Sequence, residues 1–172
     1  HLGEIKGHDY AIASLPDVVK AHPQVHLYIG GQGSESDYER LNEVIRRLEL
    51  QEHVTLLGEI SHPFDWLTAC DLFVLTPQEE GFGLVFVEAG VCKKPVIATA
   101  VGGITDIILE DQTGFLIPPR NPQATAAAIN SLLQSPEKIE HMGEMAYRRV
   151  TENFSLDKMV DKYENVYQLI TN

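Results

Sequence analysis

The sequence is poor in cysteine and has no long apolar run. Its two cysteines, Cys70 and Cys92, stand in apolar sequence contexts, so a framework of disulfide bonds is not expected. No apolar stretch approaches the roughly 18 residues that a membrane-spanning helix requires. The first residues also lack the charged and then apolar pattern of a signal peptide. These absences predict a cytoplasmic protein without a membrane span, and leave membrane association open for the full-length protein.

Basic residues are also scarce. Lysine and arginine number 13 against 25 aspartates and glutamates, which gives a formal net charge of −12. Such a surface argues against nucleic acid or an anionic lipid surface as a partner, although one local anion site stays possible. Hydrophobic residues make up 44% and charged residues 22% of the 172 positions, which is ordinary for a folded globular protein. The length predicts one domain over residues 1–172.

Short apolar runs alternate with amphipathic stretches along the chain. The predicted strands cover residues 25–29, 53–57, 72–75, 95–99 and 114–117. Their nearly continuous apolar character is typical of strands that are covered on both faces.

Helical periodicity fills the segments between and after these strands. The predicted helices cover residues 10–20, 36–50, 84–91, 124–133 and 142–150, and a last one runs from the cap Ser155 to about residue 170. Alternation of this kind predicts an α/β fold: one Rossmann-like parallel sheet with helices on both faces, followed by extra C-terminal helices. Ligands of such sheets bind beyond the carboxyl ends of the strands.

The most informative stretch covers residues 76–89. A strand ends near Pro77, and Gly81 and Gly83 then open a helix whose first N–H groups suit a phosphate. The helix is apolar nearly all round, which predicts that it is buried with Glu88 as its one carboxylate. A buried carboxylate requires hydroxyl or N–H partners, because leaving it unpaired costs several kcal/mol. Glu80 stands at the same mouth, so the pair suits a nucleotide with sugar hydroxyls.

Spacing alone leaves a plainer alternative open. In that alternative Glu80 is a solvated loop residue and Glu88 a polar residue of helix packing. Lys6 could likewise be a solvated lysine at the start of a loop. The turn at residues 30–33 could be a simple tight turn, because it lacks the third glycine of the dinucleotide-binding fingerprint.

Several motifs, taken together, resemble the retaining glycosyltransferases of the GT-B fold, in the large group 1 family (family 4). Glu80 and Glu88 match the family's two glutamates separated by seven residues, with the Gly-Phe-Gly element at 81–83 between them. The other matching segments follow in order along almost the whole chain: residues 6–9, 29–33, 54–58, 95–104 and 113–119. The resemblance implies the nucleotide-sugar-binding C-terminal domain of such an enzyme.

The resemblance also implies a role for each matching residue. Lys6 would pair with the donor diphosphate and stabilise the leaving group, Glu80 would contact the donor sugar near the reacting face, and Glu88 would hold the ribose hydroxyls. Gly81 would open the turn that binds the diphosphate. The backbone N–H groups that would face the diphosphate are those of Phe82, Gly83, Leu84 and Val85. The residues that would border the base or line the cleft are Glu59, Ile60, Gly31 and Gly33.

The chain departs from the family pattern in three places. His1 stands where the family has an arginine that also contacts the diphosphate, which puts the catalytic competence of this chain in question. Lys93 replaces a glycine, and Thr105 with Asp106 replaces a Pro-Glu pair; both changes look tolerable. Ahead of His1 the family has a further strand and an N-terminal domain that binds the acceptor. This sequence contains neither.

The resemblance implies an enzyme that moves a hexose from a nucleotide-diphosphate sugar, with UDP or GDP expected, to a hydroxyl of a saccharide or a lipid-linked acceptor. This fragment alone is expected to be inactive. No Asp-x-Asp pair or histidine cluster offers a metal site, so no metal and no cofactor beyond the donor is expected. Two alternatives are a GT-B sugar-nucleotide epimerase and a non-catalytic module that binds nucleotide sugars. Transfer by the full-length protein would separate them.

Overall fold

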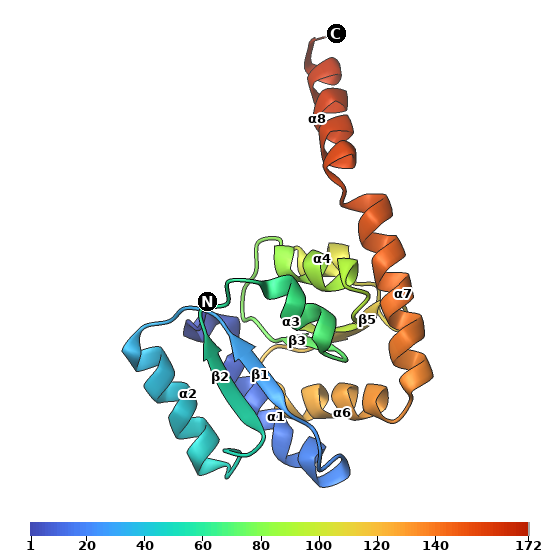
Figure 1. The fold of residues 1–172 in the computed structure, drawn as a ribbon. Helices are drawn as coiled ribbons and strands as arrows, with labels where there is room; N and C mark the ends of the chain where they lie inside the picture. The colour runs from blue at the N-terminus through green and yellow to red at the C-terminus, as the bar shows by residue number, and fades with distance from the viewer. Residues whose placement is uncertain (172) are drawn as a thin grey trace.

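Helices and parallel strands alternate along the chain in the computed structural model, which describes residues 1–171 (Figure 1). The elements in chain order are a short 3₁₀ helix η1 (Glu4–Lys6), α1 (His8–Ala21), β1 (Leu27–Gly30), α2 (Glu35–Arg47), β2 (Val54–Gly58), α3 (Pro63–Ala69), β3 (Phe73–Leu75), α4 (Leu84–Val91), β4 (Val96–Thr99), α5 (Ile104–Ile107), β5 (Gly114–Ile117), α6 (Pro122–Leu133), α7 (Pro136–Asn153) and α8 (Leu156–Thr171). The α/β class and all five predicted strands are confirmed.

Local signals in the sequence explain where most helices begin. Ser34 caps α2 in a capping box with Asp37, in which the Ser34 hydroxyl accepts from the Asp37 N–H at 3.2 Å. Asn121 and Ser135 cap α6 and α7 in the same way, and a proline occupies the first position of each helix. α6 and α7 begin before the apolar periodicity that predicts helices over 124–133 and 142–150, because their caps and prolines precede it.

The five parallel strands are divided between two sheets, where the sequence analysis names one. β1 pairs with β2 in one parallel sheet, and β3, β4 and β5 form a second parallel sheet in that order. The edges of β1 and β3 are not hydrogen-bonded to each other, because an apolar groove separates them. The sequence also gave no indication of α3 and α5, two short helices that follow β2 and β4.

Two apolar clusters form the core. One gathers around α1, α2, β1, β2 and α6, and the other around β3, β4, α4, α5 and α7. Figure 1 shows α8 extending away from the rest of the domain, and its apolar side chains such as Leu156 and Tyr163 are exposed. None of the helices within residues 1–171 is long and apolar enough to cross a bilayer.

Candidate functional site

Two residues predicted to act at the same site meet although they are 74 positions apart. The Lys6 ammonium Nζ donates to Oε2 of Glu80 at 2.8 Å, and the two side chains are 30% and 15% exposed. Glu80 is therefore not a solvated loop residue. The ion pair brings the cation predicted for the diphosphate against the carboxylate predicted for the donor sugar.

The backbone around Lys6 is fastened to the loop that follows β3. Gly7 adopts a left-handed conformation with φ of +69°, and the Thr76 hydroxyl donates to its carbonyl oxygen at 2.7 Å. A Cβ at Gly7 would lie 1.9 Å from the carbonyl oxygen of Thr76, so only glycine permits this approach. The Gln78 N–H also donates to the Ile5 carbonyl at 2.8 Å. These contacts place η1 at the carboxyl end of β3.

The turn at Gly102 and Gly103, after β4, supports the backbone on which Glu80 stands. The Gly103 N–H donates to the Gly81 carbonyl oxygen at 3.2 Å. A Cβ at Gly102, which has φ of +50°, would lie 1.8 Å from the Glu80 carbonyl oxygen. The Glu80 side chain turns back on its own loop, because its Oε1 accepts from the Gly81 N–H at 3.1 Å. The loop backbone is thus held by a neighbouring loop from the same sheet edge.

The first turn of α4 presents unpaired backbone donors at this edge. Gly83 caps the helix with φ of +88°, and a Cβ there would lie 2.5 Å from the Phe86 ring. Within residues 1–171, no acceptor pairs with the N–H groups of Phe82, Gly83, Leu84 and Val85. Unpaired N–H groups at a helix start carry partial positive charge and attract anions. These are the N–H groups that the resemblance assigns to the donor diphosphate, and their role there stays a prediction.

Glu88 lies inside α4, but the helix is less buried than the sequence predicts. Leu84 is 67% exposed and Val91 is 45% exposed, whereas Phe86 and Ala89 are buried. Glu88 itself is half-buried, and among the described residues its carboxylate makes no hydrogen bond or ion pair. The helix presents one face to the core and the other to solvent, so Glu88 is available to an external partner.

The remaining predicted residues form a second group at the ends of β1 and β2. The Gly31 N–H donates to the Gly58 carbonyl at 2.8 Å, and a Cβ at Gly30 would lie 1.9 Å from the Ile60 side chain. Gly33 packs against Leu2, whose N–H donates to the Gln32 carbonyl at 2.8 Å. Glu59, next to Ile60, is exposed. The chain from residue 2 to Lys6 connects this group to the Lys6–Glu80 pair.

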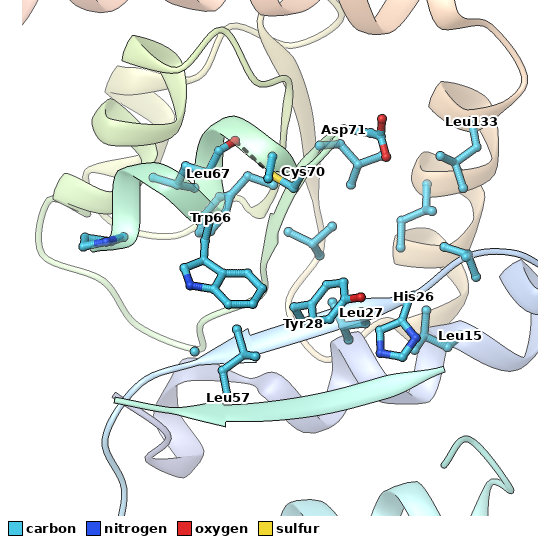
Figure 2. Close-up of a pocket in the computed structure, with 18 of the residues that line it drawn as sticks. Leu15, His26, Leu27, Tyr28, Leu57, Trp66, Leu67, Cys70, Asp71 and Leu133 are labelled. Atoms are coloured by element: carbon cyan, nitrogen blue, oxygen red, sulfur yellow. Dashed lines mark hydrogen bonds between the residues drawn. The ribbon is translucent and has the colours of Figure 1, made fainter. Parts of the chain in front are cut away.

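A further cavity lies apart from the Lys6–Glu80 pair. A groove of about 780 Å³ lies between β1 and β3, and its walls also come from α3 and α6 (Figure 2). Tyr28 and Trp66 stand at its rim with ring centroids 5.6 Å apart, and they are 52% and 42% exposed. Of the predicted site residues only Ile60 and Val85 line it. Its walls are mainly apolar, which does not suit a charged diphosphate.

Sequence reasoning missed one cation near η1. Arg120 follows the two prolines after β5, and its Nε donates to Gln78 Oε1 at 2.8 Å. The amide nitrogen of Gln78 donates in turn to the Glu4 carbonyl at 3.4 Å. The position of Arg120 beyond the carboxyl end of a strand is the signal that could have drawn attention to it.

Among residues 1–171, no group of three histidine, cysteine, aspartate or glutamate side chains is arranged to hold a metal ion. The cation in direct contact with Glu80 is the Lys6 ammonium.

Comparison with known proteins gives matches over nearly the whole chain. The family described as "Glycosyl transferases group 1" matches residues 1–149. N-acetyl-alpha-D-glucosaminyl L-malate synthase of Bacillus anthracis is 32% identical over 162 residues, covering 91% of this chain and 42% of the relative. Glycogen synthase of Mycobacterium tuberculosis is 30% identical over 164 residues, covering 94% of this chain and 39% of the relative. The chain thus spans less than half the length of these curated relatives.

Solved structures share the fold. HepE of Anabaena, crystallised in complex with UDP and glucose, superposes with a TM-score of 0.89 at 27% identity, over 96% of this chain and 46% of that chain. The C-terminal domain of a glycosyl transferase group 1 family protein from Francisella tularensis gives a TM-score of 0.82 at 25% identity. That match covers 90% of this chain and 82% of the other, so the unit described here corresponds to nearly all of a domain crystallised by itself.

Proposed function

This chain belongs to the group 1 glycosyl transferases, and we propose that it is the donor-binding half of a retaining glycosyltransferase. The proposed reaction moves a hexose from UDP or GDP to a hydroxyl of a saccharide or lipid-linked acceptor. The observation that supports this most directly is the convergence of Lys6, Glu80 and the unpaired N–H groups of residues 82–85 at one sheet edge. These are the groups that a diphosphate and a sugar require.

In the proposed mechanism, the chain stabilises the departing nucleoside diphosphate. The Lys6 ammonium and the N–H groups at the start of α4 neutralise negative charge that grows on the diphosphate as the bond to the sugar breaks. Such preorganised donors contribute several kcal/mol to a transition state. Glu88 holds the ribose hydroxyls, Glu80 the sugar hydroxyls, and residues 59 and 60 border the base.

The binding half of this proposal is tested by thermal unfolding with UDP, GDP and their glucose and mannose conjugates. A ligand that binds only the folded state stabilises it by RT ln(1 + [L]/Kd), about 2.7 kcal/mol at a hundredfold excess over Kd. At least one conjugate is expected to raise the unfolding temperature. If none does at millimolar concentration, the proposed donor site is wrong.

The acceptor site and the catalytic base belong, in this proposal, to an N-terminal domain ahead of residue 1.

The resemblance places one further strand before that residue, and the groove between β1 and β3 suits it. The backbone hydrogen bond from Leu2 to Gln32 places the start of α1 near the carboxyl end of β1. The helix α1 then runs back toward the first residue of β1. A strand that precedes α1 therefore runs parallel to β1, as in a right-handed βαβ unit. In the groove it pairs both open edges and joins the two sheets.

Donor binding is expected to survive removal of divalent ions. Lys6 and the α4 donors supply the positive charge, and residues 1–171 hold no metal-ligand cluster. The affinity for the nucleotide sugar is measured by calorimetry in EDTA and again in magnesium or manganese. Equal affinities support the assignment of charge. A loss in EDTA that either metal restores would contradict it.

Glu88→Gln is expected to weaken the free nucleoside diphosphate and its sugar conjugate alike. The ribose is common to both ligands, and a lost hydrogen bond to a charged group costs about 1.5–3 kcal/mol, or roughly 10- to 150-fold in Kd. Calorimetry with both ligands measures this. The control is Glu140→Gln, which removes an exposed carboxylate on α7 and should change neither affinity. Weakening of the conjugate alone would place Glu88 on the sugar instead.

A further inference from the structure

The Glu80 carboxylate contacts Lys6, which the proposed function assigns to the diphosphate, and also the Gly81 N–H, which lies just before the proposed phosphate donors at 82–85. Its Oε2 accepts from Lys6 Nζ at 2.8 Å, and its Oε1 accepts from the Gly81 N–H at 3.1 Å. The side chain is 15% exposed, so water screens this contact only in part. Glu80 thus stands where the proposed function places an external anion, at the opening of the glycine turn.

The backbone beneath Glu80 is held by the loop that follows β4. Gly103 bonds to the Gly81 carbonyl at 3.2 Å, and Gly102 packs so closely that a Cβ there would lie 1.8 Å from the Glu80 carbonyl oxygen. The Lys6–Glu80 contact can therefore be broken by side-chain rotation alone, while the loop backbone stays in place. An incoming phosphate must therefore compete with Glu80 for the Lys6 ammonium.

We propose that Glu80 is an internal competitor that makes the site select a diphosphate that carries a sugar over a free diphosphate. This rests on the proposed function. A free diphosphate that takes Lys6 leaves the displaced carboxylate without a partner and close to a like charge, which opposes binding. A donor with a sugar supplies hydroxyl groups to that carboxylate, so the cost is compensated. After transfer the sugar is gone, and Glu80 returns to Lys6 and favours release of the nucleoside diphosphate.

The test compares UDP with UDP-glucose, or GDP with GDP-mannose, by calorimetry on the wild type and on Glu80→Gln. We expect Glu80→Gln to bind the free diphosphate roughly three- to tenfold tighter and the conjugate more weakly, so that the preference is lost or reversed. The matched control is Glu79→Gln, which removes the same charge from the adjacent exposed residue. It should alter neither affinity.

A second variant isolates the role of Lys6. In a Lys6→Met background, adding Glu80→Gln should no longer strengthen binding of the free diphosphate, because the competitor acts through the ammonium. If Glu80→Gln binds the free diphosphate no more tightly than the wild type does, the competition is refuted while the donor site stands. If the wild type binds neither ligand, the proposed function fails and the competition fails with it.

Discussion

The purified 172-residue chain is expected to bind a nucleotide sugar and to transfer no sugar from it. In the proposed function, donor binding depends on Lys6, Glu88 and the first turn of α4, all of which the chain contains. Transfer also requires an acceptor hydroxyl and a base held against the donor, which the proposal places in the N-terminal domain. Holding two reactants in the reacting geometry contributes about 7–11 kcal/mol to lowering a barrier, a factor of roughly 10⁵ to 10⁸.

The measurement follows release of UDP or GDP from the conjugate that the chain binds, with saccharide acceptors present. Enzymes of ordinary speed turn over about once per second or faster. A rate of that order from the isolated chain would contradict the division of labour between two domains. Binding is measured on the same preparation, so an unfolded sample cannot imitate the expected result.

Hydrogen exchange, compared between this chain and a longer protein, tests the strand proposed for the groove. In a longer protein that includes the segment ahead of residue 1, the backbone amides of β1 and β3 that face the groove should exchange hydrogen more slowly, because the strand pairs with them. Equal exchange in both proteins would mean that the groove stays open.

The strands could be predicted from the sequence because each is a short apolar run, and glycine or proline stands at the end of several of them. Gly58 is the last residue of β2, and Pro118 follows β5, which ends at residue 117. α3 and α5 were not predicted, because a helix of seven or four residues is too short to show an apolar period. The division into two sheets was not predicted for another reason: apolar patterning identifies a strand but not the neighbour with which it pairs.

The candidate site also has a part that the local sequence predicts and a part that depends on tertiary packing. The glycines at 81 and 83 and the two glutamates are adjacent in sequence, so their shared location follows from one strand-to-helix connection. The contact of Lys6 with Glu80 depends on how η1 packs against the loop after β3, and nothing local to either residue encodes it. The burial of Glu88 was overestimated because apolar composition does not show which face of α4 the core covers.

Lowering the pH from 6.5 to 4 is expected to destabilise the chain by about 3 kcal/mol through His8 alone. His8, the first residue of α1, is buried, and its pKa falls from 6.5 to about 4. Burial is the main cause, and the charges of Arg40 and Lys6 lower the pKa further, while Asp9 opposes them. The folded chain therefore keeps the imidazole neutral at pH values at which the unfolded chain has already bound a proton.

The sign of the effect follows from this difference. Above pH 6.5 both states carry a neutral His8, and its full contribution to stability is present. As the pH falls from 6.5 to 4 the unfolded state binds one more proton, so the free energy of unfolding decreases by about 1.4 kcal/mol per pH unit. Below pH 4 both states are protonated, and this decrease ends.

Denaturant unfolding of the wild type and of His8→Gln at several pH values from 7 to 4 measures the effect. Glutamine does not titrate, and it can still donate toward the His1 carbonyl, which lies 3.1 Å from His8 Nε2. The difference between the two pH profiles isolates His8 from the Asp37 and Glu144 carboxyls, whose pKa values are lowered by the Ser34 cap and by Lys93. His141→Gln, which removes an exposed histidine of α7, is the control and should keep the wild-type slope. Parallel profiles for wild type and His8→Gln would show that His8 is protonated in the folded chain, with water reaching the junction between η1 and α1.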